Sequence, residues 1–165
     1  MTKDLYPVAV ASDHAGVEMK AGILRELAES GYPVEDLGPG DGCAVDYPDY
    51  GEAVAERVAS GAVRLGILVC GTGVGMSIAA NKVPGVRAAL LYDDTTARYA
   101  RRHNDANVVV FGARTMRPEE VLSRLRLFLS ETFDGGRHEG RLSKIRSIEQ
   151  RRGAPAVEGA IGCPT

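Results

Sequence analysis

Residue types suited to acid–base chemistry and anion binding follow the apolar runs of this sequence. Asp13 and His14 come directly after the first run. Cys70 ends the third run, and Arg114 follows the fifth. Because the carboxyl ends of parallel strands lie at one edge of a sheet, we expect these residues to gather there. The Asp13–His14 pair could supply an acid–base group and a phosphate ligand, or only a helix N-cap beside a surface histidine.

A glycine-rich segment, CGTGVGMS, begins at Cys70 and contains Gly71, Gly73 and Gly75. Such glycines let successive backbone N–H groups point inward and bind an anion where a strand leads into a helix. A dinucleotide site with Asp93 as the ribose ligand is one alternative, although the segment follows the third strand and its spacing differs from the dinucleotide fingerprint. A tight turn without a ligand is another. A nucleotide P-loop is excluded because no Gly-Lys-Ser/Thr follows.

Cys70 lies where the positive end of the following helix favours a thiolate. A buried structural cysteine is the ordinary interpretation of a single cysteine. Two chemical interpretations stay open: a general base that carries a proton to and from carbon, or a nucleophile with His14 or His103 as its base. A cysteine phosphatase is excluded, because Met76 stands six positions on, where that loop needs arginine.

Two more polar groups lie in the second half of the chain. Arg137 and Arg141 are four residues apart and share one helix face, where like charges repel unless an anion lies between them. A solvated basic face and a phosphate clamp are both compatible with this spacing. His103 and Asn104 match a helix C-cap on local grounds, with Asn104 in the left-handed conformation.

Short apolar runs alternate with longer amphipathic segments, which predicts an α/β fold with a parallel sheet and right-handed crossovers. The predicted strands are Val8–Ser12, Val34–Leu37, Leu65–Cys70, Val86–Leu91 and Asn107–Phe111. The predicted helices are Val17–Ser30, Tyr50–Ala59, Met76–Asn81, Thr95–His103, Pro118–Thr132 and about Glu139–Arg152. We expect a Rossmann-like, doubly wound sheet of about five strands with helices on both faces, in one domain over residues 1–152. Residues 153–165, rich in Gly, Ala and Pro, are expected to form a tail.

The composition excludes several functional classes. The chain has 165 residues, with 20 Lys and Arg against 22 Asp and Glu, and this near-neutral balance argues against nucleic-acid or anionic-membrane partners. The three cysteines, Cys43, Cys70 and Cys163, lack metal-binding spacing, so we expect neither a disulfide framework nor a metal site. No signal-peptide pattern or membrane-spanning stretch is present, so a cytoplasmic location is expected.

Five segments, in order along the chain, resemble the type B ribose-5-phosphate isomerases, which are grouped with the galactose-6-phosphate isomerase subunits. They are SDHAG at 12–16, DYPDYG at 46–51, CGTGVGMSIAANK at 70–82, RHNDANVVVFGAR at 102–114 and GGRHEGR at 135–141. The resemblance extends to about Arg152. It implies an aldose–ketose isomerase of the pentose phosphate pathway, without metal or organic cofactor, that interconverts ribose 5-phosphate and ribulose 5-phosphate through a cis-enediolate.

The resemblance also implies catalytic roles. Cys70 is implied as the base between C2 and C1, and Thr72 as a helper in proton transfer among the oxygens. The N–H groups of Gly71, Gly73 and Gly75 would hold the enediolate oxygen. Asp13 and His103 are implied to open the sugar ring. The implied substrate contacts are Tyr47, Asn104, His14, Arg137, Arg141 and Arg114, the last four of them with the phosphate.

In this family His103 and Asn104 come from the neighbouring subunit, and the last helix packs across the dimer. The resemblance therefore implies a homodimer or tetramer with shared active sites. The same chemistry on a tetrose 4-phosphate, allose 6-phosphate or galactose 6-phosphate is the nearest alternative. A non-catalytic nucleotide-binding module and a cysteine hydrolase are alternatives from other classes.

Overall fold

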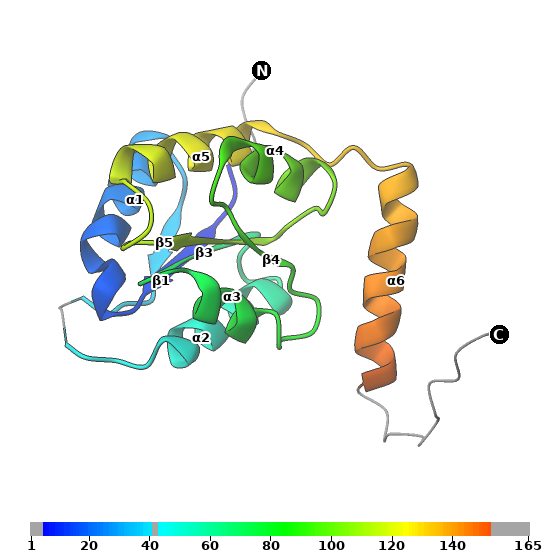
Figure 1. The fold of residues 1–165 in the computed structure, drawn as a ribbon, viewed down its shortest axis with the longest axis horizontal. Coiled ribbons are helices and arrows are strands. Elements are labelled where there is room, and N and C mark those ends of the chain that lie inside the picture. Colours follow the sequence, from blue (N-terminus) through cyan, green and yellow to red (C-terminus); the bar gives the residue numbers. More distant parts are fainter. Residues whose placement is uncertain (1–4, 41–42, 153–165) are drawn as a thin grey trace.

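Five parallel strands pair in the order β2-β1-β3-β5-β4, in a computed structural model that describes residues 5–40 and 43–152 (Figure 1). The strands are β1 (Val8–Ser12), β2 (Val34–Asp36), β3 (Leu65–Cys70), β4 (Ala88–Leu90) and β5 (Val108–Gly112). The helical elements are η1 (His14–Gly16), α1 (Val17–Glu29), α2 (Tyr47–Ala59), α3 (Val74–Ala80), α4 (Asp94–Arg102), α5 (Pro118–Ser130) and α6 (Arg137–Arg152). The predicted α/β class and the five-stranded parallel sheet are confirmed.

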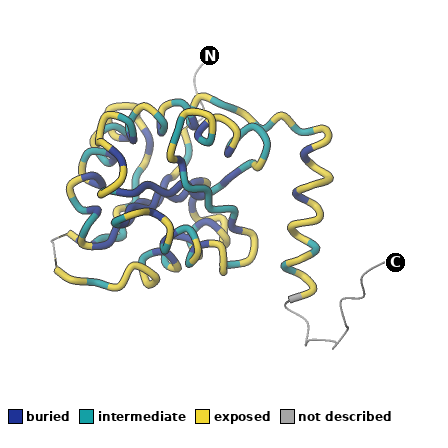
Figure 2. The backbone as a smooth tube through the Cα atoms, viewed as in Figure 1, coloured by how far each residue is buried: buried dark blue, intermediate teal, exposed yellow. Residues whose placement is uncertain are grey.

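The sheet is covered on both faces, which explains why its central strands are apolar without alternation. Helices α1, α4 and α5 pack on one face, against the side of β1 that carries Val8 and Val10. Helices α2 and α3 pack on the other face, against Ala9 and Ala11. The buried strands run through the middle of the molecule with exposed helix surfaces above and below them (Figure 2).

Helix α2 lies especially close to the sheet, because small residues line the face beneath it. A Cβ atom on Gly66 of β3 would lie 2.5 Å from Cγ1 of Val54 on α2. A larger residue at position 66 would therefore push the helix away from the strand. This packing positions the start of α2 relative to the end of β3, where Cys70 lies.

Several predicted boundaries were wrong. Helix α2 begins at Tyr47 rather than at residue 50, with Asp46 as its N-cap and a proline in its first turn. Helix α3 begins at Val74 rather than at residue 76, because Gly73 adopts a left-handed φ of 81° as its N-cap. Helix α6 begins at Arg137, two residues before the predicted start. Strands β2 and β4, each three residues long, are shorter than predicted.

The order in which the chain adds strands to the sheet reverses between β1 and β3. From β1 the chain passes through α1 to β2 on one side, and from β2 through α2 to β3 on the other. Loops at the carboxyl ends of two such strands lead away in opposite directions, and the region between them is the usual ligand position in open α/β sheets. Here that region lies between the loop after Ser12 and the loop after Cys70.

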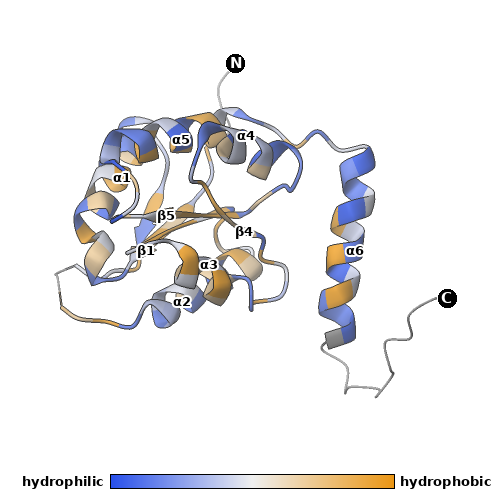
Figure 3. Ribbon diagram, viewed as in Figure 1, coloured by the Kyte–Doolittle hydropathy of each residue, from blue (hydrophilic) through white to orange (hydrophobic). Residues whose placement is uncertain are grey.

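Helix α6 stands apart from the two helical layers, beyond the edge of the sheet formed by β4 (Figure 1). It is mostly hydrophilic with hydrophobic bands (Figure 3), among them Ile145 and Ile148, which are 39% and 50% exposed. Among the described residues, none of the helices combines the length and apolarity that crossing a membrane requires. The predicted tail at 153–165, including Cys163, lies outside the described residues.

Candidate active site

Three neighbouring strands end in one row of functional residues. The backbone N–H of Asp13 donates to the Val69 carbonyl over 3.0 Å, and Cys70 is the register partner of Gly112 on β5. Adjacent strands lie ~4.8 Å apart, so Asp13 and Cys70 lie next to each other at the ends of β1 and β3. The predicted gathering of Asp13 and Cys70 at one edge of the sheet is confirmed.

Cys70 is the last residue of β3, and its side chain is 4% exposed on the sheet face covered by α2 and α3. Its Sγ accepts a hydrogen bond from the backbone N–H of Gly73 over 3.2 Å. The loop therefore holds the sulfur next to its own backbone N–H groups.

The glycine loop leaves no room for side chains at two of its positions. A Cβ atom on Gly73 would lie 2.4 Å from Cδ1 of Leu90, and one on Gly75 would lie 2.7 Å from the ring of Tyr47. Tyr47 is 41% exposed, so its ring covers the loop while one side stays open to solvent. The glycines thus allow the Tyr47 ring to come close to the loop that carries Cys70.

Arg114 lies beside Gly71, at the start of this loop. Its backbone N–H donates to the Gly71 carbonyl over 2.8 Å, and its Nη1 lies 3.4 Å from where a Gly71 Cβ would be. The side chain of Arg114 is exposed. Its guanidinium therefore borders the backbone N–H groups, and the local charge favours an anion.

The carboxylate of Asp13 has a structural partner. Its Oδ1 accepts hydrogen bonds from the N–H groups of Ala15 and Gly16, over 2.9 and 3.2 Å, which makes it the N-cap of η1. The side chain is 7% exposed, and these bonds fix it at the carboxyl end of β1. His14, the first residue of η1, is exposed beside it.

A second group of predicted site residues surrounds His103, the C-cap of α4. The imidazole of His103 is stacked between Tyr99 and His138, with ring centroids 4.2 and 4.1 Å away. Its Nε2 lies 4.0 Å from Oδ2 of Asp134. Nε of Arg137 donates to Nε2 of His138 over 3.5 Å within the first turn of α6, and the stacking of His138 on His103 holds the start of α6 against the end of α4.

The surroundings of His138 carry positive charge. Burial lowers the pKa of His138, and the charges of His103, Arg137 and Arg141 lower it further, while Asp134 opposes them. Burial disfavours any charge, whereas the neighbouring basic side chains disfavour only a positive charge and attract a negative one. The two arginines are predicted phosphate ligands, and the positive charge around them suits that role.

His103, Asp134 and His138 offer three ligand atoms within 4.8 Å of one another. The two imidazole planes are nearly parallel, at 12°, so their nitrogen lone pairs do not converge on one point. Both oxygens of Asp134 also accept from Nε of Arg102, over 3.1 and 3.2 Å. The geometry and the arginines therefore oppose a cation at this group.

The two groups of residues lie at opposite ends of the sheet. Helix α4 runs antiparallel to the strands and ends at His103, just before β5 begins, and β5 then leads back to Gly112 beside Cys70. The first and last residues of β5 are four steps of ~3.3 Å apart, ~13 Å in all, with the sheet between the two groups. Within one chain, His103 cannot act on a molecule held at Cys70.

The structure therefore divides the predicted site residues into two sets. The set at the carboxyl ends of the strands contains Asp13, His14, Tyr47, Cys70, Gly71, Thr72, Gly73, Gly75 and Arg114. The set at the start of α6 contains His103, Asn104, Arg137 and Arg141.

The sequence did not single out His138, Asp134 or the stacking of Tyr99 on His103. The spacing of Tyr99 and His103, four residues apart on one helix, is a signal for that contact.

One alternative finds no support in the structure, and one prediction about an individual residue was wrong. Asp93, the ribose ligand of the dinucleotide alternative, caps α4 through a hydrogen bond from the Thr96 N–H, and β5 separates its strand from β3. The residue with a left-handed φ after α4 is Asp105, at 43°, and not Asn104.

Residues 8–145 match the family model described as Ribose/Galactose Isomerase. The chain is 43% identical to ribose-5-phosphate isomerase B of Escherichia coli over 145 residues, which cover 88% of this chain and 97% of that protein.

Two solved structures are similar over nearly their whole length. Ribose-5-phosphate isomerase B of Clostridium thermocellum has a TM-score of 0.87 and 44% identity, over 88% of this chain and 99% of that one. The enzyme of Mycoplasma genitalium, with bound ribulose-5-phosphate, has a TM-score of 0.84 and 42% identity, over 87% and 96%.

Proposed function

This chain belongs to the ribose/galactose isomerase family and is a sugar-phosphate isomerase, and we propose that it interconverts ribose 5-phosphate and ribulose 5-phosphate with Cys70 as the base. The observation that carries the proposal is the position of the Cys70 sulfur. It is buried at the end of β3 and accepts a hydrogen bond from the Gly73 N–H. The sulfur therefore lies next to the backbone N–H groups of the glycine loop, which can bind an oxyanion.

The proposed reaction begins on the open-chain aldose. The Cys70 thiolate removes the proton from C2, and the electron pair moves through the new C1–C2 double bond to the C1 oxygen. The resulting cis-enediolate takes the proton back from the Cys70 thiol at C1. The C2 hydroxyl loses its proton as C2 becomes the ketone carbonyl, and the C1 oxygen gains one. Thr72, exposed on the same loop, is proposed to pass the proton between these oxygens.

The backbone N–H groups of Gly71, Gly73 and Gly75 are proposed to stabilise the enediolate oxygen, whose charge grows as the C–H bond breaks. General-base catalysis typically supplies ~10²–10⁴-fold, so these donors must contribute much of the rest. Tyr47, packed on Gly75, is proposed to close the sugar site from one side. No cofactor is required, because the proton removed from one carbon is returned to the other.

The site is proposed to form between two copies of the chain. Ring opening needs an acid–base pair at the sugar, and His103 lies at the opposite end of the sheet from Asp13 and Cys70. A second copy would supply His103 and Asn104, together with Arg137 and Arg141 for the phosphate, while His14 binds the phosphate from the first copy. Helix α6 supports this arrangement, because its half-exposed Ile145 and Ile148 line an open groove of about 430 Å³ beside β4.

A panel of aldose phosphates with four, five and six carbons tests the proposed substrate. We expect the highest kcat/KM for ribose 5-phosphate, with ribulose 5-phosphate as the product identified by NMR. A higher kcat/KM for a tetrose, allose or galactose phosphate would contradict the substrate assignment and leave the chemistry intact. Failure to isomerise any of them would contradict the proposed function itself.

A further inference from the structure

The chain turns between α4 and β5, and this turn carries His103 and Asn104. Asp105, the next residue, adopts a left-handed φ of 43° although it is not a glycine. A side chain makes that conformation costly, and aspartate and asparagine tolerate it better than most residues do. The neighbouring structure must therefore supply contacts that hold residues 104 and 105 in place.

Arg87, the residue before β4, supplies several of these contacts. Its Nε donates to the backbone carbonyls of both Asn104 and Asp105 over 3.0 Å. Its Nη2 donates to the Asp105 carbonyl as well, and pairs with Oδ2 of the Asp105 carboxylate over 3.0 Å. The planar guanidinium thus binds oxygen atoms of two consecutive residues at once, a geometry that a lysine ammonium group does not reproduce.

The backbone of Arg87 is fixed to the far end of the same turn. Its N–H donates to Oδ1 of Asn107 over 2.7 Å, and its carbonyl accepts from the N–H groups of Asn107 and Val108, over 3.3 and 3.4 Å. Nδ2 of Asn107 donates in addition to the Gly85 carbonyl over 2.9 Å. The side chain of Arg87 is only 21% exposed. The turn from residue 104 to residue 107 is therefore built around a fixed arginine.

A second arginine holds the other oxygen of the Asp105 carboxylate. Nη1 of Arg101, on α4, lies 2.9 Å from Oδ1 of Asp105 and also donates to the Ala106 carbonyl over 3.2 Å. The Arg101 guanidinium lies over the ring of Phe128 on α5, 5.9 Å from the ring centroid. Asp105 therefore links α4, through Arg101, to the start of β4, through Arg87. A glycine at position 105 would adopt the same φ with less strain but could form neither ion pair.

We propose that Arg87 is a positioning residue of the isomerase, one that holds this turn so that His103 and Asn104 meet the sugar bound in the neighbouring copy. The inference rests on the proposed function, in which His103 opens the sugar ring and Asn104 contacts the sugar. The stacking of His103 between Tyr99 and His138 fixes the plane of its imidazole. The hydrogen bond from Arg87 to the Asn104 carbonyl fixes the backbone that follows, and with it the direction of the Asn104 side chain.

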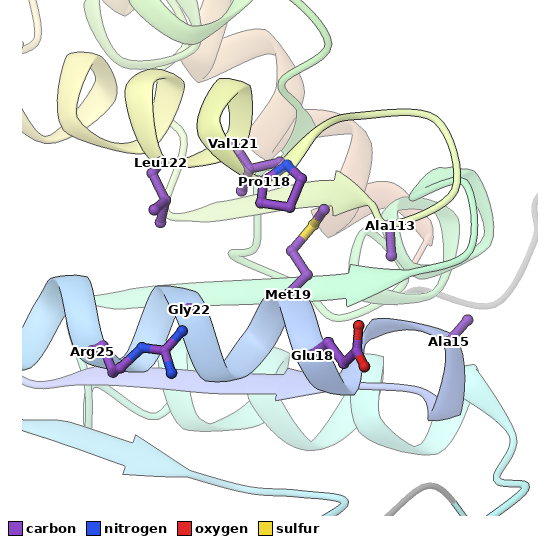
Figure 4. Close-up of a pocket in the computed structure, with 9 residues that line it drawn as sticks. All are labelled: Ala15, Glu18, Met19, Gly22, Arg25, Ala113, Pro118, Val121 and Leu122. Atoms are coloured by element: carbon purple, nitrogen blue, oxygen red, sulfur yellow. The ribbon is translucent and has the colours of Figure 1, made fainter.

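Arg87→Met removes the hydrogen bonds of the guanidinium and keeps an unbranched side chain. Conversion of ribose 5-phosphate should fall by about tenfold or more, because ring opening depends on the position of His103. Exchange of the C1 protons of ribulose 5-phosphate with solvent needs no ring opening, so at saturating substrate its rate should stay within about threefold of wild type. Arg25→Met, at an exposed arginine of α1 beside the groove between α1 and α5 (Figure 4), is the matched control and should leave both rates unchanged.

Arg87→Lys keeps the charge and one donor group, so it provides the test if the methionine variant does not fold, and its conversion of ribose 5-phosphate should lie between those of wild type and Arg87→Met. Circular dichroism establishes that each variant is folded at the assay temperature. Equal losses of conversion and exchange would show that Arg87 only stabilises the fold, and wild-type conversion by folded Arg87 variants would show that it has no effect on His103. Either result overturns the proposal. A wild-type chain that neither converts ribose 5-phosphate nor exchanges these protons would contradict the proposed function instead.

Discussion

Replacing Cys70 with alanine should lower kcat for ribose 5-phosphate by about 10³-fold or more, because the variant has no group to take the proton from C2. Binding of the sugar phosphate should persist, since the proposed phosphate ligands are unchanged. Cys43→Ala is the matched control, because Cys43 is an exposed cysteine between β2 and α2 that has no proposed role in the reaction, and it should keep wild-type activity.

Exchange of the C2 proton with solvent identifies the lost step. Ribose 5-phosphate deuterated at C2 should lose its label to water with the wild type and keep it with Cys70→Ala, as followed by NMR. A variant that still exchanges the label at nearly the wild-type rate would show that another group is the base. The backbone N–H groups of the glycine loop would then remain the proposed oxyanion site, but Cys70 would no longer be the proposed base.

Replacing His103 with asparagine should separate ring opening from proton transfer. Ribose 5-phosphate is mainly cyclic, so its conversion should fall by about 10²-fold or more when the acid–base group for ring opening is lost. Ribulose 5-phosphate has no free hydroxyl that can close a five-membered ring on its ketone, because O5 carries the phosphate. Exchange of its C1 protons with solvent should therefore stay within about threefold of the wild-type rate.

The two variants thus predict opposite results in the same exchange assay. Cys70→Ala should lose exchange at C1 of ribulose 5-phosphate, and His103→Asn should keep it. Equal loss of exchange in both variants would place His103 in the proton transfer at carbon rather than in ring opening. If His103→Asn converts ribose 5-phosphate at the wild-type rate, His103 has no role in the reaction.

The central strands and the loop after Cys70 could be predicted from the sequence. The predicted ranges of β1 and β3 agree with the structure, because uninterrupted apolar runs mark strands buried on both faces. The order of the strands could not be predicted. The strand order depends on which strands β5 pairs with. The insertion of β5 between β3 and β4 brings Arg114 beside Gly71.

The division of the site into two sets of residues could not be predicted from the sequence pattern alone either. His103 and His138 are 35 positions apart, and their stacking depends on where α6 begins and how it returns to the end of α4. Local patterns describe caps and helix faces but not such contacts. The start of α2 is different, because the aspartate and proline at 46 and 48 are recognisable start signals.

The claim that two copies complete each active site is tested most directly by mixing Cys70→Ala with His103→Asn. Each variant alone is inactive on ribose 5-phosphate, since every site contains its lesion. In a mixed pair one site carries both lesions and the other carries neither, so random exchange of copies should restore about one quarter of wild-type activity. If each chain held a complete site, every site would keep one lesion, and an inactive mixture would contradict the account.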